Sequence, residues 1–169
     1  MRNKYPSVEA IRELPLLGND VIPKKWEDLN GHVNVSYYLW LYNQMGWSMF
    51  GQIGITEHYF NERRLGFVDL ENHTRYLSEL HVGERVSVYG CYLAQDAKRV
   101  QGMVFVVNDD TDALACSIEF LAISMDLEQR RATAIPGDIA TQLADAIEQY
   151  TALDWSAPAI MQIASKGPN

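Results

Sequence analysis

The chain has 169 residues, the size of one domain, and its 47% hydrophobic and 21% charged residues are ordinary for a globular protein. This composition excludes a disordered chain, a collagen-like fibre and a disulfide-stabilised miniprotein. The 14 basic and 22 acidic residues give a net charge of −8, which argues against a general nucleic-acid binder.

The sequence also predicts a cytoplasmic protein. No apolar run approaches the ~18 residues of a membrane-spanning helix, so no membrane partner is expected. The first residues contain no apolar signal-peptide core. Cys91 and Cys116 lie in apolar runs, which is typical of buried free thiols in a reducing compartment.

The first third of the chain predicts one strand and one long helix. Residues 1–19 are expected to form an appendage with a short helix, and the proline-containing run 21–26 predicts an edge strand. Residues 28–34 are a polar loop. Residues 36–52 predict a helix that is apolar on nearly all sides, and such a helix is buried within other elements.

The rest of the chain predicts mostly strands. Gly54 ends the long helix, and Thr56 is a candidate cap for a second, short one. Turn residues then separate apolar runs, which indicates antiparallel hairpins. The expected elements are a helix over 57–64, strands over 67–77, 85–93, 100–107 and 114–125, a helix over 137–153 and a tail from 154.

These elements predict an α+β fold in which an antiparallel sheet curls around the helix at 36–52. A sheet that is hydrophobic on one face must cover that face, and this helix is long and apolar enough to do so. We therefore expect a central domain over 20–136, followed by a helix and tail over 137–169. Open sheet edges favour assembly into dimers or tetramers.

The segment between the first strand and the long helix is the first candidate site. Asp28, the turn residue Gly31 and His32 come just before the helix begins. Free amides at a helix N-terminus can polarise a carbonyl oxygen, and a carboxylate opposite can act as base or nucleophile. The alternative is a plain loop in which Asn34 or Ser36 merely caps the helix.

This segment resembles a motif of hotdog-fold acyl-CoA thioesterases of the 4-hydroxybenzoyl-CoA thioesterase type. A closer resemblance is to the thioesterase domain associated with carnitine dehydrogenase, which is linked to betainyl-CoA hydrolysis. The matching stretches are Asp28-x-Asn30-Gly31-His32-Val33-Asn34 before Tyr38, Glu71-x-His73-x-Arg75, Leu80-His81-x-Gly83-Glu84 and Asp96-Ala97-Lys98-Arg99.

The resemblance implies the hotdog fold and a role for each residue of the motif. Asp28 matches the catalytic carboxylate, which acts as general base or as nucleophile. The backbone amides of Val35 and Ser36 would hold the thioester oxygen, and His32 and Asn34 would line the same pocket. Related enzymes that carry a Glu on the central helix are a poor match, because residues 36–52 contain no acid.

Glu71, His73 and Arg75 alternate along a predicted strand, so their side chains share one face. Glu71 or His73 could assist Asp28, or the three could form an exposed face with a Glu–Arg pair. No metal site is expected, because the histidines lack the spacing of metal ligands, and no cofactor is implied.

Two further groups are candidates for substrate binding. Lys98 and Arg99 are either exposed turn residues or a cationic spot for the CoA phosphates. Trp26 and Tyr38 are either core residues or part of a cage for a quaternary ammonium or another acyl group. The other aromatic residues near the motif are Tyr37, Trp40, Tyr42 and Trp47.

The sequence thus predicts an acyl-CoA thioesterase for a small acyl group, with betainyl-CoA as the leading candidate. A hydratase or dehydratase on the same fold is one alternative, but its Asp-x-Asn-Pro-x-His pattern is absent because Gly31 follows Asn30. A non-catalytic acyl-CoA-binding regulatory module is the other, and Asp28 argues against it.

Overall fold

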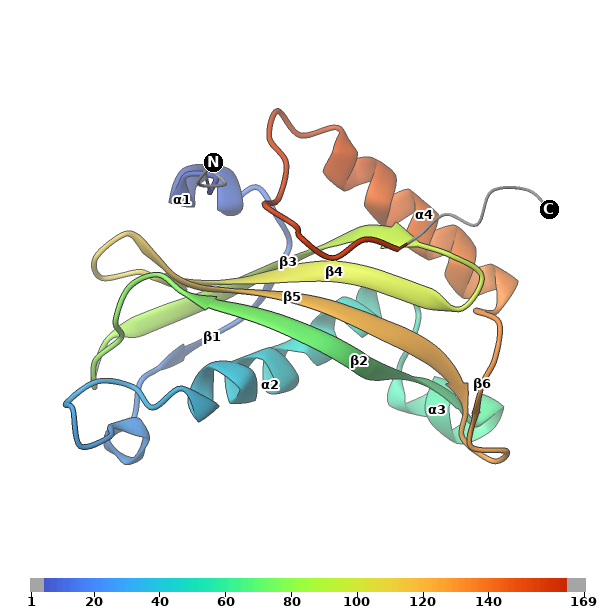
Figure 1. Cartoon of the computed structure of the whole chain (residues 1–169), viewed down its shortest axis with the longest axis horizontal. Coiled ribbons are helices and arrows are strands. Elements are labelled where there is room, and N and C mark those ends of the chain that lie inside the picture. The colour runs from blue at the N-terminus through green and yellow to red at the C-terminus, as the bar shows by residue number, and fades with distance from the viewer. Residues whose placement is uncertain (1–4, 164–169) are drawn as a thin grey trace.

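The computed structural model describes residues 5–163, which form one sheet and five helical segments (Figure 1). The α+β architecture predicted above is confirmed. The strands are β1 (Leu16–Val21), β2 (Leu65–Tyr76), β3 (Arg85–Gln95), β4 (Arg99–Asn108), β5 (Ala113–Asp126) and β6 (Arg131–Ala132). The helices are α1 (Val8–Ile11), the 3-10 helix η1 (Lys24–Trp26), α2 (Ser36–Gln52), α3 (Glu57–Arg63) and α4 (Gly137–Thr151).

All neighbouring strands pair antiparallel, in the order β1-β3-β4-β5-β2, with the short β6 paired to the end of β5. The four strands predicted after the long helix are confirmed to within two residues at each end, and only β6 was missed. Thr56 caps α3 as expected, because its side chain accepts the Tyr59 amide at 3.3 Å. β1 and β2 are the two edges of this sheet.

Helix α2 lies along the inner face of the sheet and runs antiparallel to β2. Tyr38 packs edge-on against Tyr76, with ring centroids 5.1 Å apart, and Phe50 stacks on Phe67 at 5.7 Å. The start of α2 therefore lies beside the end of β2. The buried residues of α2 keep the spacing of one helical face, namely Tyr38, Leu41, Tyr42 and Met49.

The outer face of the sheet is also covered, which the sequence did not predict. Figure 1 shows α2 on one side of the sheet and α1 and α4 on the other. Trp155, which follows α4, packs edge-on against Phe105 of β4 and Tyr150 of α4. Strands β3, β4 and β5 are thus mostly buried on both faces, which explains their apolar sequences.

The first strand lies earlier than expected. The strand predicted over 21–26 is wrong, because β1 ends at Val21 and η1 follows. Pro23 has no amide hydrogen to donate to a β-ladder, and its carbonyl instead accepts the hydrogen bond that closes η1. β1 begins inside the segment predicted as an appendage. Residues 1–4 of that segment and residues 164–169 of the predicted tail lie outside the described residues.

A buried carboxylate fastens the last described segment to the outer face. Glu119 of β5 is 1% exposed, and it accepts hydrogen bonds from Gln101 Nε2 at 2.7 Å and from the amides of Ile160 and Met161, both at 2.9 Å. This anchor explains why residues without helical or strand periodicity still pack on the sheet.

We expect Glu119→Ala to lower the free energy of unfolding by about 1–3 kcal/mol, because it leaves buried donors without an acceptor. Urea unfolding monitored by circular dichroism measures the change. Glu128→Ala is the matched control, since that side chain is 70% exposed. Equal midpoints for the Glu119 variant and the wild-type chain would contradict the anchoring role.

Candidate active site

The loop between η1 and α2 is closed by its own backbone. Glu27 and Val33 form an antiparallel bridge, and the Asp28 amide donates to the His32 carbonyl at 2.9 Å. The Gly31 amide donates back to the Asp28 carbonyl at 3.2 Å, and Gly31 has φ +85°. A side chain at that position would be strained, so the glycine is what allows the tight turn after Asp28.

The Asp28 carboxylate is held within this loop. Its Oδ1 accepts the Asn30 amide at 2.7 Å, and His32 Nδ1 lies 3.6 Å from the same oxygen. Oδ2 has only a long contact with Asn30 Nδ2, at 3.4 Å. The side chain is 20% exposed. One oxygen is thus fixed and the other is available to a substrate or a water molecule.

The Val35 amide is open at the start of α2. Asn34 Oδ1 accepts both the Ser36 amide at 3.0 Å and the Ser36 hydroxyl at 2.7 Å, so Asn34 caps the helix. The Val35 amide has no acceptor among residues 5–163, and Val35 is 54% exposed. Of the two amides predicted to hold a thioester oxygen, Val35 is therefore free and Ser36 is occupied by the cap.

A cleft of about 320 Å³ lies between the start of α2 and the end of β2. His32 and Val35 line this cleft from the loop, and Tyr38 lines it from α2. Burial raises the pKa of Tyr38 to about 12, so its hydroxyl stays protonated. The remaining lining residues are Val33, Tyr76, Leu77, Ser78 and Glu79.

Trp26 does not line this cleft. It is 2% exposed, stacks on Tyr37 with a centroid distance of 4.9 Å, and meets Trp40 edge-on at 4.9 Å. Trp26 is a core residue that packs beneath the loop. It does not line the cleft, so it is not placed to contact a substrate there. Tyr38 is the predicted aromatic residue that does reach the cleft.

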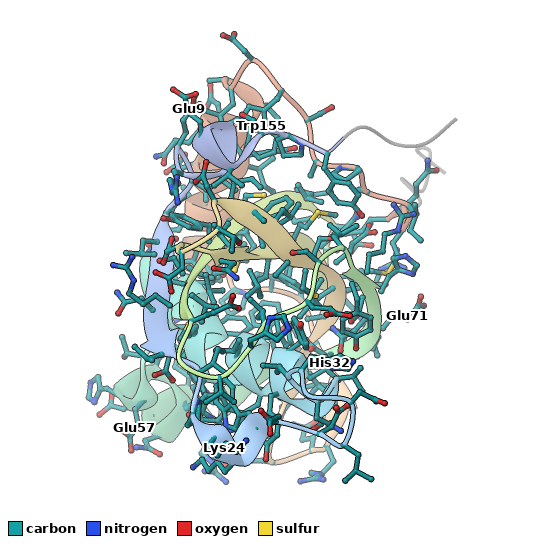
Figure 2. The ribbon with its side chains drawn as sticks, turned by 90° about the vertical axis from the view of Figure 1, so that its left-hand side faces the viewer. Glu9, Lys24, His32, Glu57, Glu71 and Trp155 are labelled. Atoms are coloured by element: carbon teal, nitrogen blue, oxygen red, sulfur yellow. The ribbon has the colours of Figure 1, made fainter. Side chains whose placement is uncertain are left out.

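The structure separates Glu71, His73 and Arg75 from Asp28. His73 lies opposite the outward-facing Glu119 in the β2–β5 ladder, so these alternating side chains lie on the outer face, away from α2. Figure 2, viewed from the end where the loop lies, shows Glu71 at the β2 edge of the molecule and His32 in the loop. Within one chain, neither Glu71 nor His73 comes near the cleft.

Two of these residues form a small network on the outer face. Arg75 Nε donates to His73 Nε2 at 3.0 Å, and Arg75 Nη1 donates to the Tyr5 hydroxyl at 3.2 Å. Because His73 accepts through Nε2, the neutral ring carries its proton on Nδ1. Glu71 is exposed and takes no part in this network.

Lys98 and Arg99 lie at the turn between β3 and β4, on the order of 30 Å along β3 from the end nearest the loop. Arg99 is held by Asp96, with Nε and Nη2 at 2.8 and 2.6 Å from Oδ2. Burial opposes ionisation of Asp96, but hydrogen bonds from Arg99 and two amides lower its pKa overall. Lys98 forms no ion pair with any described residue and remains exposed.

Sequence reasoning missed a second cavity, which we name the aromatic pocket. It has a volume of about 250 Å³ and lies between α2, α3 and the sheet. Asp69 of β2 lies at this pocket and accepts the Tyr42 hydroxyl at 2.7 Å. Five elements contribute to it, so no local motif signals it. The aromatic lining residues are Tyr42, Trp47, Phe50, Phe60, Phe67, Tyr92 and Phe120.

Within residues 5–163, no helix is long and apolar enough to cross a membrane. The same part of the chain brings no three His, Cys, Asp or Glu side chains together as a metal site.

Residues 22–143 match the family model described as the thioesterase-like superfamily. An L-carnitine dehydrogenase/betainyl-CoA thioesterase from Agrobacterium fabrum is 27% identical over 111 residues, which cover 66% of this chain and 22% of that protein. A betainyl-CoA thioesterase from Pseudomonas aeruginosa is 26% identical over 134 residues, which cover 79% and 83%. The chain thus spans about a quarter of the bifunctional relatives and most of the shorter one.

The fold also has a counterpart among solved structures. A Staphylococcus aureus protein characterised in complex with CoA superposes with a TM-score of 0.74 at 22% identity, covering 92% of this chain and 94% of the other. At this identity the likeness concerns the fold, a curled antiparallel sheet around a central helix.

Proposed function

Because the chain belongs to the thioesterase-like superfamily and has the hotdog fold, we propose that it hydrolyses an acyl-CoA thioester to a free acid and CoA. One observation carries the proposal: the Asp28 carboxylate lies 3.6 Å from Nδ1 of His32, and His32 lines the cleft where the Val35 amide is open. A base or nucleophile and a polarising donor are the two parts that acyl transfer requires.

In the proposed reaction, the Val35 amide donates to the thioester oxygen and the dipole of α2 stabilises the charge that develops there. Asp28 either removes a proton from the attacking water or attacks the carbonyl itself to give a mixed anhydride that water then opens. In both routes the C–S bond breaks and CoA leaves as the thiolate, which then takes up a proton. His32 would orient the carboxylate, and Asn34 would hold the start of the helix.

No electrons are transferred in this hydrolysis, so the proposal involves no redox cofactor. In the proposed reaction Asp28, and not a metal ion, activates the water molecule. The acyl group we propose is small, with betainyl-CoA as the leading candidate. The names of the Agrobacterium and Pseudomonas relatives, at 27% and 26% identity, support that choice.

We further propose that the protein works as a homodimer, or as a tetramer built from such dimers, joined through β2. This edge strand exposes Val68 by 47%, Leu70 by 51% and Tyr76 by 49%. An unpaired strand with exposed apolar residues is a template for pairing with a second strand. An antiparallel pair of β2 strands would also bring Lys98 of one copy to the same end as the cleft of the other.

We expect Lys98→Ala to raise KM for CoA esters roughly three- to fivefold and to change kcat less, because an exposed lysine that binds phosphate acts on binding alone. Steady-state kinetics at low salt measure both constants. Arg99→Ala should have the weaker effect on KM, since Asp96 already engages that guanidinium. An unchanged KM in Lys98→Ala would show that this lysine does not contribute to substrate binding.

The acyl group is tested by thiol release from a panel of betainyl-, acetyl-, octanoyl- and 4-hydroxybenzoyl-CoA. Selective turnover of betainyl-CoA supports the proposal as stated. Selective turnover of another ester corrects the acyl group and keeps the thioesterase. CoA binding without release of thiol from any ester would identify a non-catalytic module instead.

A further inference from the structure

The aromatic pocket combines apolar walls with a single charged group. Its walls include Trp47, Phe50, Phe60 and Phe67, and Asp69 is its carboxylate. The residues that line it include no lysine, arginine or histidine. A ligand in this pocket therefore meets aromatic side chains and a negative charge, with no cationic residue lining the pocket.

Asp69 is only partly used by the protein. Its Oδ2 accepts the Tyr42 hydroxyl at 2.7 Å and Asn72 Nδ2 at 3.2 Å, while Oδ1 accepts no hydrogen bond from residues 5–163. Burial, and then the charge of Asp69, raise the pKa of Tyr42, so its phenol remains a neutral donor. Tyr42 thus positions the carboxylate and leaves one oxygen open.

A second polar atom at the pocket also lacks a partner. The Tyr92 side chain lines the pocket and is 2% exposed, and its hydroxyl has no hydrogen-bond partner among the described residues. The lone pairs of this hydroxyl oxygen, like the open oxygen of Asp69, can face a cation, although an alkylated ammonium group forms no hydrogen bond with them.

Aromatic faces and a carboxylate are the chemistry that recognises an alkylated ammonium ion. Such an ion is attracted by the electron-rich faces of Trp, Tyr and Phe, and its methyl groups need apolar walls rather than hydrogen-bond acceptors. We propose that the aromatic pocket binds an alkylated ammonium group on the acyl part of the substrate, with Asp69 and Trp47 as the selecting residues. This inference rests on the proposed thioesterase activity and assigns the site of its specificity.

The position of the aromatic pocket determines whether its ligand can reach Asp28 of the same chain or of a second copy. At about 1.5 Å per residue, α2 from Ser36 to Trp47 spans roughly 16 Å. In a betainyl thioester only one methylene separates the ammonium from the carbonyl, so a group in this pocket cannot reach Asp28 of the same chain.

A second copy removes this difficulty. The pocket lies at the Phe67 end of β2, and the cleft lies at the Tyr76 end. An antiparallel pair of β2 strands centred between Glu71 and Asn72 places Phe67 of one copy opposite Tyr76 of the other. The pocket of one copy then adjoins the cleft of its partner, where Asp28 acts.

The test compares two esters of nearly equal shape. Betainyl-CoA carries a trimethylammonium group, and 3,3-dimethylbutyryl-CoA carries a tert-butyl group in its place. We expect the wild-type protein to show a kcat/KM at least roughly tenfold higher for the cation. Equal values for the two esters would overturn the cation site while leaving the thioesterase in place.

Variants test which residues cause the preference for the cationic ester. Asp69→Asn should lower kcat/KM for betainyl-CoA about 10- to 100-fold and leave the value for the neutral ester within about threefold. Trp47→Leu should act in the same direction. Glu62→Gln on α3 is the matched control, because it removes one acidic charge near the pocket without lining it. Equal losses on both esters in Asp69→Asn would mean that Asp69 only supports the fold.

Failure of the proposed activity gives a different result. If neither ester nor any other CoA ester is hydrolysed, the thioesterase proposal fails, and the pocket is judged by calorimetric affinity alone. Tighter binding of betainyl-CoA than of its isostere, lost in Asp69→Asn, supports the cation site. Equal affinities of the two esters would overturn it.

Discussion

Asp28→Asn is expected to lower kcat for the preferred acyl-CoA by about 10²- to 10⁴-fold, with little change in KM. An amide can neither accept a proton from water nor attack a thioester. Its Oδ1 can still accept the Asn30 amide that now binds the carboxylate at 2.7 Å, so the turn at Gly31 should persist. Thiol release under saturating substrate measures kcat directly.

Asp20→Asn on β1 is the control for this substitution, since it also exchanges a partly exposed Asp that accepts a neighbouring amide. Its kcat should match the wild-type value, and circular dichroism should give the same spectrum for all three proteins. If Asp28→Asn lost less than tenfold with its fold intact, the chemistry would have to move to another group, and Glu71 or His73 from a second copy would be the next to test.

Leu70→Lys should convert the protein to monomers and lower kcat/KM by roughly a hundredfold or more, because positioning groups supplied by the partner are lost. Leu70 is 51% exposed on the edge strand β2, and a lysine there opposes edge-to-edge pairing. Light scattering coupled to size-exclusion chromatography gives the mass, and thiol release gives the rate.

The opposite edge supplies a matched control. Leu16 on β1 is also 51% exposed, and Leu16→Lys makes the same chemical change at the other end of the strand order. We expect that variant to keep both its mass and its activity. An active Leu70→Lys protein with unchanged mass would show that β2 does not form the interface.

The parts of the fold that the sequence predicted are those with local signals. Helix α2 has an apolar helical repeat and a cap at Asn34, and the hairpins of β3, β4 and β5 have strong turn residues. The loop around Asp28 was predictable for the same reason, because the turn at Gly31 and the cap lie within a few residues. Pro23 is a local signal as well. The sequence places it within an edge strand, whereas in the structure β1 ends just before it, at Val21.

The parts that escaped prediction depend on contacts between distant segments. Glu119 looks like one polar residue in an apolar strand, and only the fold shows that it accepts the amides of Ile160 and Met161. Likewise, alternation placed His73 and Arg75 on one face but could not say which face. The aromatic pocket needs residues from five elements, and Asp69 carries no motif that would single it out.

The most direct test of the account is product analysis for the wild-type protein with betainyl-CoA. We predict that mass spectrometry finds CoA and the free acid in equal amounts, accumulating over many turnovers. If betainyl-CoA and every other ester of the panel were bound by the protein but stayed intact, that result would contradict the central claim that the carboxylate of Asp28 and the start of α2 form a hydrolytic site.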